Sequence, residues 1–344
     1  MLDIFIGSLS TKKNNNGGER QKSSLMYREL LNICDSVVCI NLERHRFFSV
    51  LKLIIVCLFR RKQINSIIIS KFAKGGITIH KILFYLHFDF SKVSYFLVGS
   101  KLIDYINTKN YKYIKEDKMI VVESCSLKNE LLRKYPNLKV EVLSNFKKIF
   151  DLDVGTKNYP QKQLRLVFFS RLLIEKGVLD LIHSLECLNS ENTIFLLDIY
   201  GPESEDPKEK KTIRDAIARC ESFCSYKGNL PMPSIDSYKI LSLYDLHVFP
   251  TRFSEGIPGT IIDCFICGLP TLSSSFPRAE DLLDFDDSYF YKQFDNDDLI
   301  KKLDYIYNHQ NELLAKREKT FRKRNSYSTD IFVDFVIKKG IIAS

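Results

Sequence analysis

Two carboxylates eight positions apart, Glu255 and Asp263, are the residues of this chain whose setting is most informative about chemistry. Glu255 stands in a loop marked by glycine and proline, and Asp263 stands in an apolar run that predicts a helix. Amides at the start of such a helix point along its axis and form a site for an anion. Acids beside an anion site suit a ligand with phosphate at one end and hydroxyl groups at the other, as in a nucleotide sugar. The loop between the acids consists of Gly256, Ile257, Pro258, Gly259 and Thr260.

Asp263 is expected to be buried, because the residues on both sides of it are apolar. A buried carboxylate needs hydrogen-bond partners, and a pair of ligand hydroxyl groups would supply them. For Glu255 the alternative is a surface or helix-start charge without a ligand.

Three more loops follow predicted strands in the second half of the chain. Arg171 and Lys176 precede a glycine that opens a helix, and a guanidinium and an ammonium there suit a diphosphate. Surface charges on a solvated turn are the alternative for both. Two other strand ends carry glycine, where a ligand can approach the backbone or where the chain simply turns. The residues of these two loops are Gly201, Gly228, Asn229 and Leu230.

These loops must be positioned by parallel sheets, because short apolar strands alternate with helical patterns along the chain. The expected fold is α/β, with two doubly wound Rossmann-like domains. Residues 1–145 form the first domain, 146–163 a polar linker and 164–324 the second domain, and 325–344 form a last helix packed on the first domain. The predicted strands are Leu2–Ile6, Ser36–Ile40, Ser66–Ile69, Val93–Val98, Met119–Val122, Lys139–Leu143, Leu164–Phe169, Thr193–Ile199, Phe223–Tyr226, Leu246–Phe249, Pro270–Ser273 and Ser288–Tyr291.

Charge is distributed unevenly over the 344 residues, whose net charge is +9. Residues 1–160 hold 27 lysines and arginines against 14 acids, which favours an anionic neighbour such as a phospholipid surface or a phosphate-bearing substrate. Nucleic acid is not expected, because no zinc-finger spacing, RNP-like motif or basic zipper is present. The nine cysteines are scattered through apolar segments, and Cys264-x-x-Cys267 lacks a second metal-binding pair. With no signal-peptide pattern at residues 1–6, we expect a cytoplasmic protein.

The motifs of residues 164–275, taken in order, resemble those of the retaining glycosyltransferases of family 4, which have the GT-B fold. They are a strand followed by S-R-x-x-x-E-K-G, a Tyr-Gly strand end, the strand D-L-x-V-F-P, E-G-x-P with an acid eight positions after the Glu, and C-G-L-P. In the family the last acid is usually Glu, whereas this chain has Asp263. The resemblance to the family is weaker over residues 1–145.

The resemblance implies a role for each of these residues. Arg171 and Lys176 would hold the diphosphate of a UDP- or GDP-type donor, Glu255 would support the sugar in the transition state, and Asp263 would bind the ribose hydroxyls. Amides of Gly256–Thr260 would meet the sugar and phosphate. It also implies that no metal or other cofactor is needed, and that the leaving phosphate itself takes the acceptor proton.

The first domain would then bind the acceptor across a cleft, with Gly17 and Gly18 at the end of the family's glycine loop or in a simple helix-start turn. His80 and His87 could serve as bases. Both lie in apolar sequence, however, so we expect their imidazoles to be packed in the core. The run Phe47–Lys62 is too short to cross a bilayer. It would seat on an anionic membrane or form an ordinary buried helix.

The sequence therefore predicts a metal-independent retaining glycosyltransferase that moves a hexose to a glycan, on a lipid carrier, in bacterial surface polysaccharide assembly. Its partners would be the nucleotide sugar, the lipid-linked acceptor and the inner face of the cell membrane. A GT-B sugar-nucleotide epimerase or hydrolase, which needs no acceptor, is one alternative. A non-catalytic partner subunit of a glycosyltransferase is another.

Overall fold

The computed structural model describes residues 1–344 except 11–16, 44, 107 and 343–344. The chain divides into two compact units, each with its own sheet. Unit 1 comprises residues 1–148 and 327–344, and unit 2 comprises residues 149–326. The loop that precedes the first helix was predicted to bear a glycine site, and its residues 11–16 lie outside the described residues.

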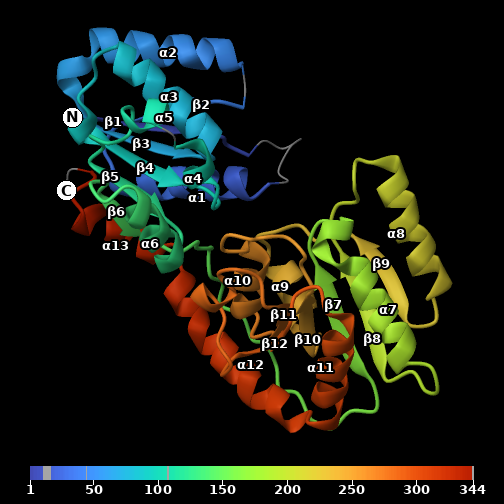
Figure 1. The fold of residues 1–344 in the computed structure, drawn as a ribbon. Helices are drawn as coiled ribbons and strands as arrows, with labels where there is room; N and C mark the ends of the chain where they lie inside the picture. Colours follow the sequence, from blue (N-terminus) through green and yellow to red (C-terminus); the bar gives the residue numbers. More distant parts are fainter. Residues whose placement is uncertain (11–16, 44, 107, 343–344) are drawn as a thin grey trace. The chain divides into compact units, whose positions relative to one another are not determined.

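Unit 1 has a six-stranded parallel sheet in the order β2-β1-β3-β4-β5-β6 (Figure 1). Its strands are β1 (Leu2–Gly7), β2 (Val37–Asn41), β3 (Ile64–Lys71), β4 (Val93–Leu97), β5 (Met119–Val122) and β6 (Val140–Val142). Its helices are α1 (Gly18–Ile33), α2 (Arg46–Phe59), α3 (Ala73–Tyr85), α4 (Leu102–Tyr105), α5 (Thr108–Tyr111), α6 (Cys125–Lys134) and α13 (Asp330–Lys338), with 3₁₀ turns at Arg61–Gln63 and Phe90–Lys92.

Successive residues of β3 face opposite sides of this sheet, as the strand period requires. Ile67 and Ile69 pack in one core layer, and Ile68 packs in the other. The second layer also contains Phe332 and Val336 of α13, both fully buried. The last helix therefore completes the core of unit 1.

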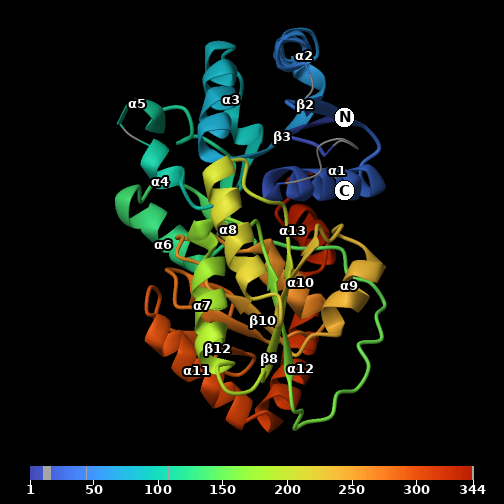
Figure 2. The ribbon, with the colours of Figure 1, turned by 90° about the vertical axis from the view of Figure 1, so that its right-hand side faces the viewer.

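Unit 2 has a second six-stranded parallel sheet, in the order β12-β11-β10-β7-β8-β9 (Figure 1). Figure 2 shows β8 and β10 between α7 on one side and α9 on the other. Its strands are β7 (Leu164–Phe169), β8 (Phe195–Tyr200), β9 (Cys224–Gly228), β10 (Leu246–Phe249), β11 (Thr271–Ser274) and β12 (Ser288–Tyr291). Its helices are α7 (Val178–Leu188), α8 (Pro207–Arg219), α9 (Ile235–Ser242), α10 (Gly259–Ile266), α11 (Asn296–Asn308) and α12 (Asn311–Lys323), with 3₁₀ turns at Ile174–Lys176 and Ala279–Asp281.

Helices cover both faces of this second sheet. Leu166 and Phe168 of β7 pack in the layer that holds α7, α8 and α11, whereas Val167 and Phe169 pack in the layer that holds α9 and α10. The doubly wound α/β fold predicted for both halves is confirmed.

Two local predictions were wrong. The tail 325–344 was expected to form one helix, but a 3₁₀ turn at Arg324–Tyr327 and α13 are separated, and the Ser328 hydroxyl accepts a hydrogen bond from the Asp330 amide. His87 was expected in the core, but it is exposed in a left-handed turn beyond the end of α3, with φ of 49°. His80 is buried as expected, and its ring bonds the Gly76 carbonyl oxygen and the Asp117 carboxylate.

Candidate active site

The site in unit 2 begins at a topological switch point, where the chain leaves two neighbouring strands in opposite directions. From β7 the chain crosses to β8 on one side, and from β10 it crosses to β11 on the other. Open parallel sheets bind ligands in the crevice that this divergence leaves at the carboxyl ends of the strands. The loops at this switch point are residues 170–177 after β7 and 250–258 after β10.

Lys176 and Glu255 extend from these two loops and form an ion pair. Their side chains are only 10% and 12% exposed, so each charge is largely removed from water and depends on the other. The Thr251 hydroxyl also donates to the Glu255 Oε1 atom, over 2.9 Å. The Lys176 ammonium lies 5.3 Å from the centre of the Phe253 ring. The structure thus brings together a cation and an acid that the sequence separates by 79 positions.

A glycine with a left-handed backbone holds the first loop against the second. Gly177 has φ of 74°, and a Cβ atom at this position would lie 1.9 Å from the carbonyl oxygen of Pro250. The loops are also joined by the Arg252 amide, which donates to the Glu175 carbonyl oxygen at 2.9 Å. The Arg252 guanidinium makes two 2.6 Å bonds to Asp180 at the start of α7. These contacts fix the backbone from which Lys176 and Glu255 extend.

Arg171 and Gly201 lie at the same carboxyl edge of the sheet. Arg171 is exposed, and the structure records no ion pair for it within the described part of unit 2. Gly201 has φ of 142°, and a Cβ atom there would lie 1.8 Å from the Ser170 carbonyl oxygen, so the two strand-end loops touch. The Gly201 amide donates to the Gly228 carbonyl oxygen at 3.0 Å, which connects the third strand-end loop.

The glycine–proline loop leads directly into α10. Helix α10 begins at Gly259, after Pro258. The first amides of a helix have no partner within it, so the amides of Gly259 and Thr260 are free of intrahelical bonds. Their binding of an anion stays a prediction. Gly256 is half-buried, whereas the Ile257 side chain is buried and anchors the loop to the unit. Beyond β9, Asn229 is exposed and Leu230 is half-buried against the α9–α10 layer.

Asp263 is buried, as the apolar sequence around it predicts, with 2% of its surface exposed. Its Oδ1 atom accepts a 2.9 Å hydrogen bond from the hydroxyl of Tyr238 on α9. Burial of that hydroxyl and the neighbouring carboxylate raise the pKa of Tyr238, so the phenol remains a donor. A protein group therefore meets part of the hydrogen-bonding need that was assigned to a ligand, and the ribose role of Asp263 stays a prediction.

Gly17 and Gly18 belong to unit 1. Gly17 has φ of 148° and precedes α1, and Gly18 is the first residue of the helix. The backbone at Gly17 is one that side chains rarely adopt, which agrees with a glycine-requiring turn.

Sequence reasoning missed three residues that support the site. Thr251 bonds Glu255, Tyr238 bonds Asp263, and the Gln293 amide nitrogen donates to the Thr251 carbonyl oxygen at 2.9 Å. Thr251 stands two residues beyond the end of β10, so its place after a strand could have identified it. Gln293 stands at the same offset beyond the end of β12, whereas Tyr238, inside α9, carries no such sequence pattern.

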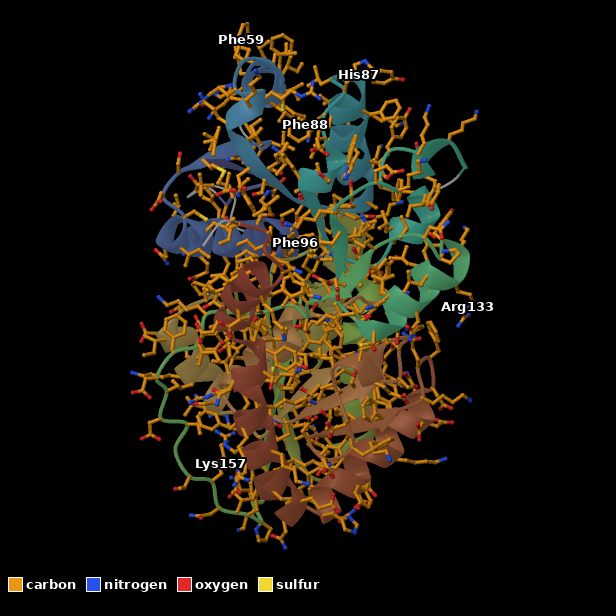
Figure 3. All side chains as sticks on the ribbon, turned by 90° about the vertical axis from the view of Figure 1, so that its left-hand side faces the viewer. Phe59, His87, Phe88, Phe96, Arg133 and Lys157 are labelled. Carbon is orange, nitrogen blue, oxygen red and sulfur yellow. The ribbon has the colours of Figure 1, made fainter. Side chains whose placement is uncertain are left out.

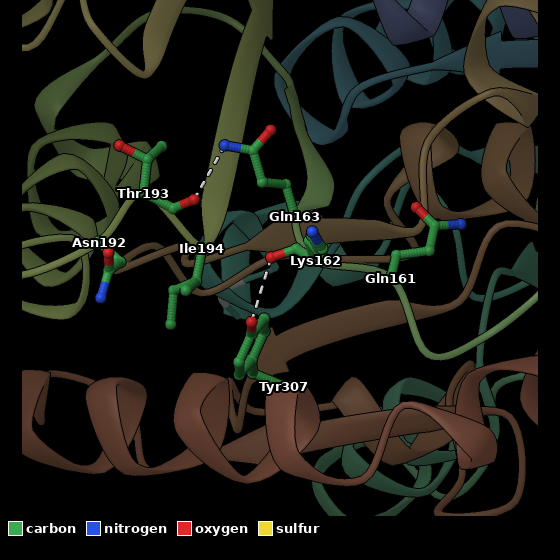
Figure 4. A pocket seen from close by; sticks show the side chains of 7 residues that line it. All are labelled: Gln161, Lys162, Gln163, Asn192, Thr193, Ile194 and Tyr307. Atoms are coloured by element: carbon green, nitrogen blue, oxygen red, sulfur yellow. Dashed lines mark hydrogen bonds between the residues drawn. The ribbon is translucent and has the colours of Figure 1, made fainter.

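A surface hollow elsewhere in unit 2 lies at the amino ends of the strands (Figure 4). Gln163 precedes β7 there and donates to the Thr193 carbonyl oxygen at 2.9 Å, while the Tyr307 hydroxyl donates to the Lys162 carbonyl oxygen at 3.1 Å. The Lys176–Glu255 pair lies at the opposite edge of the sheet, where parallel sheets bind ligands, and is the better candidate.

Comparison with known proteins finds a family match in unit 2. The family "Glycosyl transferases group 1" matches residues 163–309, which lie within unit 2 and include both switch-point loops. No curated protein matches the sequence.

Several solved structures share the fold over nearly the whole chain. Anabaena HepE in complex with UDP is 12% identical, with a TM-score of 0.74 over 99% of this chain and all of its own. A glycosyltransferase from Rickettsia africae is 16% identical, with a TM-score of 0.73 over 99% of this chain and 98% of its own. Sucrose-phosphate synthase from Thermosynechococcus elongatus is 10% identical, with a TM-score of 0.71 over 99% and 98% of the two chains. The fold is GT-B, and together with the family match it supports a glycosyltransferase.

Proposed function

We propose that this protein is a retaining glycosyltransferase of family 4 that moves a hexose from a nucleoside diphosphate to a glycan acceptor. The observation that carries the proposal is the Lys176–Glu255 pair, which joins the two loops at the switch point of unit 2. A cation and an acid held together there suit the two ends of a nucleotide sugar. Lys176 would bind the diphosphate, and Glu255 would contact the sugar. UDP is the first nucleotide to test, because Anabaena HepE is seen with UDP.

When the donor binds, the Lys176 ammonium would pair with the diphosphate as well as with Glu255. The planar guanidinium of Arg171, from the same loop, would donate further hydrogen bonds to the diphosphate. Glu255, still held by Thr251, would then stabilise positive charge that develops on the sugar ring. Other contacts to the donor within unit 2 would come from Gly201, Gly228, Asn229, Leu230, Gly256, Ile257, Pro258, Gly259, Thr260 and Asp263.

Retention would follow from attack on the same face of the sugar that the diphosphate leaves. The departing phosphate oxygen would take the acceptor proton, so the reaction would need no separate base. Arg171, Lys176 and the first amides of α10 would neutralise the charge of the leaving group, which lets the reaction proceed without a metal ion.

The acceptor would be a glycan on a lipid carrier, in the assembly of a bacterial surface polysaccharide. The excess of basic residues in 1–160 supports this choice, because a lipid diphosphate carrier and its membrane are both anionic. The protein would therefore work in the cytoplasm at the inner face of the cell membrane.

Glu255→Ala tests the proposal. We expect kcat for transfer to fall by about 100- to 1,000-fold, the loss typical of removing one transition-state contact. Asp287→Asn is the matched control, because it removes a comparable buried ion pair, with Lys323, from the opposite edge of the sheet. The control is expected to lose stability but to keep its turnover once folded.

The donor is identified first by a thermal-shift screen of UDP, GDP, ADP and CDP, because a ligand of the folded state raises the melting temperature. Wild-type turnover in Glu255→Ala would remove the role assigned to this acid. Release of free nucleotide or an epimer without any acceptor would favour the epimerase or hydrolase alternative.

A further inference from the structure

Helix α2 exposes large apolar side chains along one face for its whole length. Its inner side is fixed by Leu53 and Cys57, which are buried in the core of unit 1, and the Ser49 hydroxyl donates to the Asn41 carbonyl oxygen of β2. The outward side chains recur at helical spacing and are between 41% and 82% exposed. They are Phe47, Phe48, Leu51, Ile55, Leu58 and Phe59. A helix that is apolar on its outer face as well as its inner face needs a partner there.

The end of α3 lies beside the end of α2 and adds two exposed aromatic residues. The Arg61 guanidinium, just after α2, donates to the carbonyl oxygen of His87, just after α3, so the two helix ends are adjacent. Figure 3 shows Phe59 and His87 at the same end of unit 1. Phe84 and Tyr85, in the last turn of α3, are both exposed there. We call the exposed apolar residues of α2 together with Phe84 and Tyr85 the α2–α3 surface.

Charge around this surface identifies its partner. Residues 44–88, which contain both helices, hold nine lysines and arginines and no aspartate or glutamate. Lys52, Arg60 and Lys62 are all exposed on or directly after α2. Long cationic side chains can lie along an apolar surface while their charged ends reach phosphate groups. A second copy of the same surface would bring cations against cations, which disfavours self-association.

We propose that the α2–α3 surface docks on an anionic phospholipid bilayer, with α2 lying in the plane of the headgroups. Its 14 residues span about 21 Å, and within the described residues no helix is long and apolar enough to cross a membrane. An interfacial helix of this kind combines apolar insertion with attraction between basic residues and acidic lipids. The inference concerns unit 1 alone and does not depend on the donor site in unit 2.

Vesicle co-sedimentation of the full chain tests this proposal. We expect binding to vesicles of phosphatidylcholine mixed with phosphatidylglycerol, and at least tenfold weaker binding to phosphatidylcholine alone. The triple variant Phe48→Ser, Ile55→Ser, Phe59→Ser should lose at least tenfold in affinity. The variant Arg60→Gln, Lys62→Gln should lose about 30-fold, since each basic residue near an acidic bilayer contributes about one factor of five.

The matched control is Phe285→Ser, Phe294→Ser, which removes two phenylalanines of similar exposure, 74% and 68%, from unit 2. It should bind vesicles as the wild type does. Each variant is also melted with and without the nucleotide that stabilises the wild type, so that loss of folding or of the donor site is seen separately. Equal binding to both vesicles, no binding to either, or equal loss in the control would overturn the proposal. So would light scattering that shows a lipid-free dimer dissociated by the triple variant, because the partner would then be a second copy.

Discussion

Gly177 and Gly228 have similar left-handed backbones but very different surroundings. Their φ angles are 74° and 81°. A Cβ atom on Gly177 would lie 1.9 Å from the Pro250 carbonyl oxygen, whereas one on Gly228 would have no neighbour within 4 Å. Gly228→Ala should therefore cost only the backbone strain, about 1 kcal/mol of unfolding free energy.

The Gly177→Ala variant has the same backbone strain and in addition a clash with the Pro250 carbonyl oxygen. Because backbone must move to relieve the clash, we expect the free energy of unfolding to fall by about 3 kcal/mol or more. The movement would separate Lys176 from Glu255, so transferase turnover should fall as well. Chemical denaturation and kinetics of the two alanine variants check this. Equal stability of both variants would show that the two loops do not approach as closely as described.

His247 makes unit 2 sensitive to acid. Complete burial lowers the pKa of this imidazole to about 3, and its Nδ1 atom lies 3.2 Å from the Thr271 hydroxyl. The folded state therefore holds His247 neutral while the unfolded chain takes up a proton below about pH 6.5. A depressed histidine pKa contributes full stability above pH 6.5 and loses it as the pH falls.

Between pH 7.5 and 5.0, protonation of His247 in the unfolded chain should lower the free energy of unfolding of the wild type by about 2 kcal/mol. His247→Leu removes the titrating group, so its loss of stability over the same interval should be about 2 kcal/mol smaller. Denaturant unfolding at the two pH values measures the change in unfolding free energy of each protein. Groups that titrate in both proteins contribute equally to the two changes, so their effect cancels in the difference. Parallel losses in the two proteins would contradict the prediction.

Among the elements, α12 is joined to two other segments of unit 2 by one buried arginine. Arg317 is 4% exposed, and its Nη2 atom donates to the carbonyl oxygens of Val154, at 3.0 Å, and Ser242, at 2.8 Å. These bonds join α12 to the segment before β7 and to the end of α9. Arg317→Met keeps much of the volume but leaves both carbonyls without this donor, so we expect about 3 kcal/mol of destabilisation.

Lys323→Met, at the end of the same helix, is the comparison for Arg317→Met. Its ammonium binds Asp284 and Asp287, and it is more exposed than Arg317, so the substitution should cost less. Thermal unfolding of both variants tests the order. A larger loss for Lys323→Met would show that the carbonyl contacts of Arg317 contribute little.

All twelve strands were predictable from the sequence, and four of them, such as β7 and β10, begin and end at the predicted residues. Parallel strands buried on both faces are continuous apolar runs, which a single sequence displays plainly. The four residues Arg171, Lys176, Glu255 and Asp263 were also identifiable, since they follow strands or interrupt an apolar helix. The partner of Asp263 was not, because the contact of Tyr238 with Asp263 depends on how α9 packs on α10.

The sequence alone also did not show which side chains of α2 are exposed. Helix α2 is as apolar as a core helix, so its sequence left a buried helix and a membrane-seated helix open. Which side of a helix meets the sheet is decided by tertiary packing, and here that packing leaves Phe48 and Phe59 outside.

At the scale of the whole molecule, unit 1 is built from two separate stretches of chain. The Lys147 amide donates to the Tyr327 carbonyl oxygen at 2.8 Å, where the chain leaves unit 1 and returns to it. Deleting residues 327–344 should remove Phe332 and Val336 from the core and expose Phe96, whose ring contacts Phe332. We expect unit 1 to lose several kcal/mol of stability, since two large buried side chains are lost.

Hydrogen exchange resolved by peptide measures this loss. Strands β1, β3 and β4 should exchange faster in the deletion variant, while β7, β8 and β10 should keep their protection. Uniformly faster exchange in both units would show that they unfold together.

This interrupted arrangement also has a consequence for synthesis. Translation runs from the amino to the carboxyl end, so the whole of unit 2 emerges before α13 does. Until α13 is made, Phe96 and Phe146 of unit 1 lack the Phe332 ring that they contact in the folded core. Unit 1 is therefore completed only after unit 2 has been synthesised, and during that interval its uncovered apolar residues would be a binding site for a chaperone.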